Sequence, residues 1–247
     1  PDDWVRRTAE VFATTSGPGV FCDEQVIDAL CRCGCDLEDA RDYAVIGCVE
    51  PTPDGNTFGC TSGNDISLVG ALEMTLLRGH IRIMGRRVGP DTGDPRSFED
   101  FEQFMAAFDR QVAFMVDTVA AGVEVKDRIY AEGFHNPYVS MTLDGCVDSA
   151  RDMTCGGARY NFASISARGL GTTADSLAAV QAAIYQRGRF TMEQLLRALG
   201  RNFDGHEPMR QYLRNRTPRY GNDDPAADTI AAAVAARFCE EVSSRTC

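Results

Sequence analysis

The segment around Gly47 places the strongest restriction on the fold of this chain. Tyr43–Ile46 is a short apolar run, and such a run before a glycine predicts a buried strand. Gly47 then frees the backbone to turn, while Pro51 pushes the residue before it out of helical geometry. Glu50 is therefore expected to be extended. Because side chains two apart in an extended chain share a face, Cys48 and Glu50 should project together.

A thiol and a carboxyl that project from one loop at the end of a strand form a candidate catalytic pair. Loops held by a rigid scaffold carry catalytic residues more often than other segments do. A simpler interpretation also fits, in which Cys48 is a small core side chain and Glu50-Pro51 is a solvated turn. The spacing by itself leaves both interpretations open.

Several separated segments of the chain resemble those of one protein family. Gly47-Cys-Val-Glu-Pro51 is similar to the cysteine loop of the glycyl radical enzymes, the pyruvate formate-lyase-like family. The resemblance is to the branch that contains dehydratases, C–N and C–S lyases and some decarboxylases. Further segments follow in the family's order: Asp152 with Gly156-Gly-Ala-Arg-Tyr-Asn161, Ala174-Asp-Ser-Leu-Ala178 and Pro218-Arg-Tyr-Gly-Asn-Asp-Asp224. The resemblance covers nearly the whole chain.

The resemblance implies a radical mechanism. A glycine elsewhere in the protein would carry a stable backbone radical, installed by an activating enzyme that uses S-adenosylmethionine and an iron–sulfur cluster. Cys48 would give its hydrogen atom to that radical and then take one from a substrate carbon, with Glu50 as general base or acid. We expect no cofactor or metal on this chain itself. The expected partners are a small-molecule substrate, the activating enzyme and a second copy in a homodimer.

The same resemblance implies that the residues after Pro51 contact substrate. Aligned without gaps, Thr61 matches a threonine of the choline-cleaving lyases, but Asp65 stands where those enzymes have tyrosine. The departure argues against choline as the substrate. Asp65 is expected either to bind a hydroxylated or cationic substrate or to cap a helix from Ile66 onward. Val49 in place of a second cysteine argues against formate acetyltransferase activity.

For the fold, the resemblance implies an α/β chain that forms part of a ten-stranded barrel, with helices outside and the cysteine loop inside. No linker divides residues 1–247, so we expect a single domain fragment. The segment after Pro51 is dense in turn residues, which predicts a long loop up to Asn64. Apolar spacing and capping residues predict helices over 23–30 and 66–78, from Ser97 onward, and over about 173–185, 191–199 and 226–242. Residues 144–166 are expected to be irregular.

Several function classes are excluded or disfavoured. The net charge of −11 argues against nucleic-acid binding, and no apolar run has the length of a membrane span. Cys31, Cys33 and Cys35 lack a fourth ligand at a recognisable spacing, so we expect no metal there. Gly169-Leu-Gly171 fits a relaxed dinucleotide motif, but no second strong strand follows it. We expect a cytoplasmic protein, with a bacterial microcompartment as a further option.

The sequence thus predicts a glycyl radical lyase or dehydratase that cleaves a C–O, C–N or C–S bond of a small hydroxylated substrate. A glycyl radical decarboxylase is the nearest alternative, and a catalytically silent paralogue or thiol-rich binding domain is another. Nothing in the chain matches the family's Arg-Val-x-Gly-Tyr radical segment. We therefore expect a central fragment that is inactive alone, with its substrate and oligomeric state left open.

Overall fold

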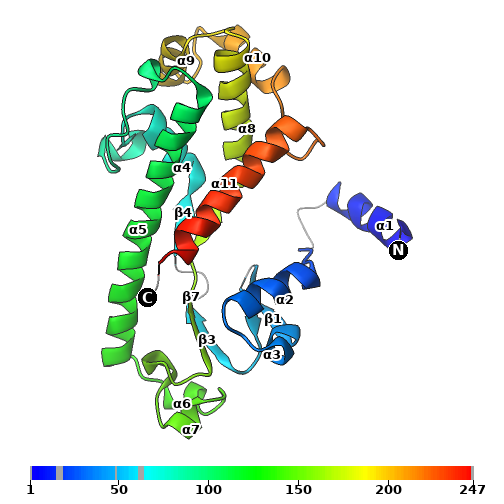
Figure 1. The fold of residues 1–247 in the computed structure, drawn as a ribbon, viewed down its shortest axis with the longest axis vertical. Coiled ribbons are helices and arrows are strands. Elements are labelled where there is room, and N and C mark those ends of the chain that lie inside the picture. The colour runs from blue at the N-terminus through cyan, green and yellow to red at the C-terminus, as the bar shows by residue number, and fades with distance from the viewer. Residues whose placement is uncertain (1, 15–18, 48, 61–63, 246–247) are drawn as a thin grey trace. The chain divides into compact units, whose positions relative to one another are not determined.

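A computed structural model of the chain describes residues 2–14, 19–47, 49–60 and 64–245. The chain divides into two compact units, which are described one at a time (Figure 1). The first unit comprises Pro1–Ser62 and Ile129–Ala163, and the second comprises Gly63–Arg128 and Ser164–Cys247. The single domain expected from the sequence stays a prediction.

The first unit combines short helices with two strand pairs. Its elements are α1 (Asp2–Phe12), α2 (Asp23–Arg32), α3 (Leu37–Arg41), β1 (Tyr43–Ile46), β2 (Glu50–Pro53), β3 (Thr57–Cys60), α6 (Pro137–Ser140), α7 (Cys146–Ser149), the 3-10 turn η3 (Met153–Cys155) and β7 (Tyr160–Ala163). Strands β1 and β2 form an antiparallel hairpin, and β3 pairs with β7 in parallel. Segments about a hundred residues apart in sequence therefore lie side by side.

A small core holds the first unit together. Leu30, Cys35 and Ala40 are buried where α2 meets α3, and the side chains of Tyr160 and Phe162 pack against them. The hydroxyl of Tyr160 donates a hydrogen bond of 2.6 Å to Asp39 Oδ2, which joins β7 to α3. Burial of apolar surface, this bond and the ion pairs of Arg159 with Asp36 and Asp39 fix the helices to the strand.

The second unit is mostly helical. Its elements are β4 (Asp65–Ser67), α4 (Leu68–Leu76), β5 (His80–Ile81), η1 (Arg82–Met84), β6 (Arg86–Arg87), η2 (Pro95–Ser97), α5 (Phe101–Gly133), β8 (Ser166–Arg168), α8 (Leu170–Val180), the π-helical turn η4 (Gln181–Gln186), α9 (Met192–Gly200), α10 (Glu207–Asn215) and α11 (Pro225–Ser243). The end of α5, from Ile129 onward, falls in the first unit.

The core of the second unit lies between α5, α4, α8 and α11. Phe104, Phe108, Val112 and Val116 are fully buried along α5 at helical spacing. The spacing of Phe98, Phe101, Met105, Phe108, Val112 and Met115 predicts a core-facing stripe, and the structure places Phe108 and Val112 in the core and leaves the other four partly buried against it. Strand β4 pairs in parallel with β8, and each of these strands leads directly into a helix, α4 and α8 respectively.

Several predicted boundaries are wrong. The helix expected from residue 66 begins at Leu68, because Asp65–Ser67 pairs with β8. Residues 52–64 are not one long loop, since parts of β2 and β3 lie within them, and residues 144–166 contain β7. These strands form only through distant partners, which local sequence patterns do not show.

Two further differences concern helices. The helix expected from Ser97 begins at Phe101, where Asp100 accepts a hydrogen bond of 2.8 Å from the backbone N–H of Gln103. Helix α10 was not expected at all, because its sequence is mostly charged and polar. The helices expected over 23–30, 173–185, 191–199 and 226–242 lie within a few residues of α2, of α8 with η4, of α9 and of α11.

The described strands pair into four separate two-stranded ladders and do not close into a barrel. The α/β class is confirmed at the level of mixed helices and strands. No helix in the described ranges has both the length and the apolar character that crossing a bilayer requires.

Candidate active site

Glu50 lies next to the turn of the β1–β2 hairpin. It is the first residue of β2 and pairs with Ile46, the last residue of β1. The backbone N–H of Val49 donates a hydrogen bond of 2.8 Å to Glu50 Oε2, which orients the carboxylate toward the turn. The extended geometry expected for Glu50 is confirmed, whereas its predicted neighbour Cys48 lies outside the described residues.

Gly47 makes this turn possible. Its φ is +64°, in the left-handed region that glycine occupies without strain. A Cβ placed on Gly47 would come within 3.0 Å of Glu50 Oε2. The residue at position 47 therefore needs to be small for two reasons, the backbone conformation and the space taken by the carboxylate.

The prediction that β1 is a buried strand is wrong within the described residues. Val45 and Ile46 have 41% and 44% of their surface exposed, and Val49 is more exposed still. The hairpin has only two strands, and α3 packs on β2, so the outer end of β1 is left uncovered. Glu50 itself is partly buried.

Asp65 is the first residue of β4, in the second unit, while Glu50 belongs to the first. An ion pair of 2.7 Å joins Asp65 Oδ2 to Nη2 of Arg168, which lies at the end of the neighbouring strand β8. Asp65 is not the cap of the following helix. That role belongs to Ser67, whose Oγ accepts a hydrogen bond of 3.0 Å from the backbone N–H of Gly70.

The β4–β8 ladder has one apolar and one polar face. Ile66 and Ala167, which are partners in the ladder, both pack into the helical core. Side chains alternate along a strand, so Asp65 and Arg168 belong to the opposite face. Arg168 was not singled out from the sequence, and only knowledge of the pairing of β4 with β8 would have revealed it. Thr61, the other expected substrate residue, lies outside the described residues.

Two carboxylates in the remaining segments that carry the resemblance, Asp152 and Asp175, join parts of the fold. Asp152 accepts four hydrogen bonds, from the backbone N–H groups of Asn136 and Thr154 and from the hydroxyls of Ser140 and Thr154. Desolvation raises the pKa of Asp152, but these hydrogen bonds outweigh it and hold that pKa at about 2. The carboxylate thus ties α6 to η3.

A second scaffold carboxylate links two of the motifs. Asp175, in the Ala174–Ala178 segment, accepts a hydrogen bond of 2.8 Å from the backbone N–H of Tyr220 and pairs with Arg219 at 3.1 Å. Both partners belong to the Pro218–Asp224 segment. The role of Asp175 is therefore to fasten the chain that precedes α11 onto α8.

The cysteine cluster shows no metal-binding arrangement. In the described ranges, no three histidine, cysteine or carboxylate side chains gather so that they could hold a metal ion. Burial, together with the charges of Cys33, Cys31 and two aspartates, raises the pKa of Cys35 to about 11. Cys35 is therefore a protonated core thiol.

Comparison with known proteins places the chain in a family. The family model for pyruvate formate lyase-like proteins matches residues 1–246. The trans-4-hydroxy-L-proline dehydratase of Clostridioides difficile is 34% identical over 99% of this chain and 31% of its own length. The (2S)-3-sulfopropanediol dehydratase of Klebsiella oxytoca is 32% identical over 97% of this chain and 29% of its own length.

A solved structure agrees with these matches. The glycerol-bound B12-independent glycerol dehydratase of Clostridium butyricum superposes with a TM-score of 0.87 and 31% identity. The match covers 100% of this chain and 31% of that chain, so this chain spans about a third of the length of such proteins. The family match over residues 1–246 and the shared fold lead to one conclusion: the chain belongs to the pyruvate formate lyase-like family of glycyl radical enzymes.

Proposed function

We propose that the protein containing this chain is a glycyl radical lyase or dehydratase, which cleaves a C–O, C–N or C–S bond of a small hydroxylated compound. One observation carries the proposal. The Gly47–Pro51 segment of the cysteine loop is present in a chain whose relatives are named as dehydratases. The names of those relatives give hydroxyproline and sulfopropanediol as their substrates, and both compounds carry hydroxyl groups, which supports a hydroxylated substrate here.

Cys48 and Glu50 are the proposed catalytic residues. The Cys48 thiol gives a hydrogen atom to the radical and the resulting sulfur radical takes one from a substrate carbon. Glu50 removes a proton from a substrate hydroxyl or donates one to the leaving group. The Val49 N–H that binds Glu50 Oε2 supports this role, because it fixes the carboxylate against the backbone of Val49, which follows Cys48 in the sequence.

Asp65 and Thr61 are the proposed substrate-binding residues. Asp65 lies on the face of the β4–β8 ladder opposite the helices. In the proposed ten-stranded barrel the helices are outside, so this face is the inner one. The carboxylate of Asp65 accepts a hydrogen bond from a substrate hydroxyl there, and Arg168 orients that carboxylate through their ion pair.

The proposal includes partners beyond this chain. A radical on a glycine of the same protein supplies the initial hydrogen abstraction. An activating enzyme that uses S-adenosylmethionine and an iron–sulfur cluster would install that radical. We further propose a homodimer located in the cytoplasm, with a microcompartment as the alternative location.

Turnover by the activated, full-length protein tests the proposal. The substrates are a panel of small diols, hydroxylated amino acids and hydroxylated sulfonates. Cys48→Ala should abolish turnover while the glycyl radical signal in electron paramagnetic resonance persists, which shows that the variant folds and is activated. Glu50→Gln should lower kcat by roughly a hundredfold or more, since general acid–base catalysis contributes about that much.

Val49→Ala is the matched control, because it changes the exposed side chain between the two proposed catalytic residues. It should retain most of the activity. Turnover by Cys48→Ala would end the radical-thiol mechanism. Release of CO₂ from a carboxylate substrate would favour the decarboxylase alternative, and an activated protein that turns over no substrate would favour the silent paralogue.

A further inference from the structure

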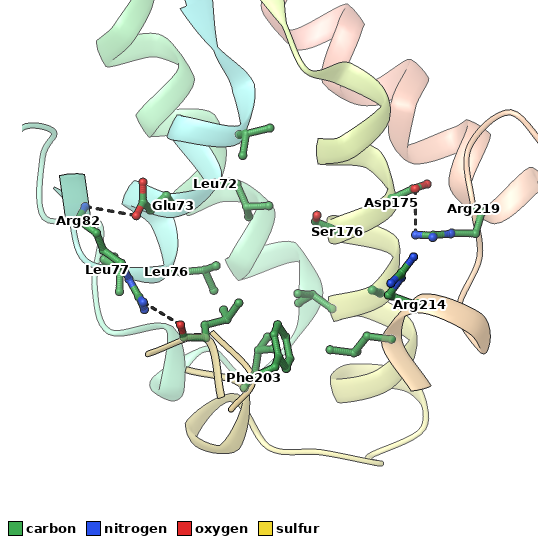
Figure 2. A pocket seen from close by; sticks show the side chains of 16 residues that line it. Leu72, Glu73, Leu76, Leu77, Arg82, Asp175, Ser176, Phe203, Arg214 and Arg219 are labelled. Carbon is green, nitrogen blue, oxygen red and sulfur yellow. Dashed lines mark hydrogen bonds and ion pairs between the residues drawn. The ribbon is translucent and has the colours of Figure 1, made fainter. Parts of the chain in front are cut away.

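A pocket in the second unit lies outside the candidate active site. It has a volume of about 430 Å³ and is lined by parts of α4, α8, α9 and α10 and by the turn after α9 (Figure 2). Pockets of roughly 300–1,000 Å³ with apolar walls and a few polar groups are typical of small-molecule sites. Glu50 and Asp65, the proposed site residues that the structure describes, do not line it.

The walls of the pocket are apolar. Leucine side chains come from three of the helices, Leu72 and Leu76 from α4, Leu195 and Leu199 from α9 and Leu213 from α10, and Val180 comes from α8. The site therefore suits the apolar body of a ligand, which gains from leaving water.

Phe203 is held in the pocket by an uncommon backbone conformation. The φ angles of Asn202 and Phe203 are +50° and +62°, so two consecutive residues other than glycine are left-handed. The backbone N–H of Phe203 donates to the carbonyl of Ala198 at 2.8 Å, which locks this turn at the end of α9. Figure 2 shows the ring turned into the pocket. Such conformations in bulky residues concentrate at ligand-binding sites.

The carboxylates of the pocket already have partners. Glu73 Oε1 accepts a hydrogen bond of 3.3 Å from the backbone N–H of Arg82, whose guanidinium donates to the carbonyl of Leu199 at 2.8 Å. Asp175 is bound by Arg219 and by the N–H of Tyr220. Asp175 is therefore neutralised by a cation, whereas Glu73 is engaged only by a backbone N–H.

Among the described arginines that line the pocket, Arg214 is the one whose guanidinium these contacts do not engage, since Arg82 binds the carbonyl of Leu199 and Arg219 pairs with Asp175. Within the described part of the chain, the guanidinium of Arg214 has no carboxylate within 4.0 Å and makes no side-chain hydrogen bond. Glu207, on the same helix, acts on Arg214 only through its charge and binds Arg210 and Gln211 instead. Figure 2 shows Arg214 extending from α10 toward the Asp175–Arg219 pair.

We propose that this pocket binds a ligand with an apolar body and a single carboxylate, with Arg214 holding the carboxylate and the leucines and Phe203 enclosing the body. The positive charge of Arg214 indicates that the head group of the ligand is an anion. A guanidinium presents a planar fork of donors that suits a carboxylate, and its position at an apolar cavity favours a head group joined to a hydrocarbon. A polypeptide segment that fills the pocket permanently is the competing occupant.

Octanoate titrated into the purified protein, followed by calorimetry, tests the proposal without radical activation, so its failure is separate from that of the proposed function. Octanoate should bind saturably at one site, and more tightly than octan-1-ol, which has the same body without the charge. Arg214→Gln should weaken octanoate binding about tenfold, the effect of losing a charged hydrogen bond, and leave octan-1-ol unchanged.

Two further variants locate the binding. Arg216→Gln removes a charge two residues away that does not line the pocket, and it should leave octanoate binding unchanged. Ala179→Phe fills the cavity and should abolish the binding of both probes. The proposal is overturned if octanoate does not bind saturably. A pocket that a polypeptide segment fills would give this result. It is equally overturned if octan-1-ol binds as tightly, or if Arg214→Gln or Ala179→Phe leaves octanoate binding unchanged.

Discussion

At the scale of single residues, Gly47 couples the backbone of the hairpin to the position of Glu50. A left-handed φ costs an L-residue about 1–2 kcal/mol, so Gly47→Ala should lower the free energy of unfolding by about 1 kcal/mol. The new Cβ would also lie 3.0 Å from Glu50 Oε2 and displace the carboxylate. We expect kcat of the activated full-length protein to fall by at least roughly tenfold, since acid–base catalysis depends on positioning.

Gly55→Ala is the matched control for this prediction. Its φ is +73°, but no atom lies within 4 Å of the added Cβ. Both variants should lose similar stability in urea unfolding, and only Gly47→Ala should lose activity. Equal activity of the two variants would show that the position of Glu50 does not depend on Gly47.

Asp152 should make the stability of the protein depend on pH in the acid range. Its pKa is about 2 in the folded state, against 3.8 for the ordinary group. A lowered folded-state pKa stabilises the fold fully above the unfolded value, and this contribution is lost as the pH falls from about 3.8 toward 2. Asp152→Asn should therefore cost about 1.5–3 kcal/mol at neutral pH, the worth of hydrogen bonds to a charged group.

The measurement is urea unfolding of wild type and Asp152→Asn at neutral pH and at about pH 3, where the difference between them should shrink. Asp54→Asn, at an exposed position of the same unit, should change little at either pH. A difference for Asp152→Asn that stays constant with pH would mean that the charge of Asp152 contributes nothing.

The candidate site was only partly predictable residue by residue. Glu50 could be identified from the sequence because local rules, a preceding glycine and a following proline, govern its conformation. The role of Arg168 could not, because its ion pair with Asp65 depends on parallel pairing of strands about a hundred residues apart. Local patterns contain no information about such a partner.

At the scale of elements, the junction of β4 and α4 depends on Ser67. Loss of an N-cap hydroxyl costs about 1 kcal/mol, so Ser67→Ala should lower the free energy of unfolding by that amount. Ser97→Ala is the control, because Ser97 was expected to cap α5 but only donates to the carbonyl of Asp94. It should cost clearly less in the same urea titration. A reversed order would contradict the assignment of Ser67 as the cap.

Helices were more predictable than strands in this chain for a physical reason. The buried stripe of α5, with Phe104 and Phe108, repeats within a few residues and is visible in the sequence. The cap of α9 was equally visible, since Thr191 and Gln194 form a capping box. Strands β7 and β8 are short, and partners contributed by residues 57–67 determine that they form.

At the scale of the whole molecule, the two units differ greatly in core size. The second unit buries a large cluster that includes Phe104, Phe108 and Leu177. The core of the first unit has Leu30, Cys35 and Ala40 as its buried members. Because apolar burial supplies most of the free energy that opposes opening, the first unit should open at a lower free energy than the second.

Amide hydrogen exchange, followed segment by segment in increasing urea, measures this difference. Amides of α5 around Phe108 and of α8 should exchange slowest. Amides of α2 and of the β1–β2 hairpin should exchange faster, and amides of α1 should exchange fastest, since α1 has no buried residue. Leu177→Ala should speed exchange throughout the second unit, because a cavity in a large core weakens the whole cooperative segment. Uniform protection of both units would mean that they unfold as one, and the smaller core would then owe its stability to the larger.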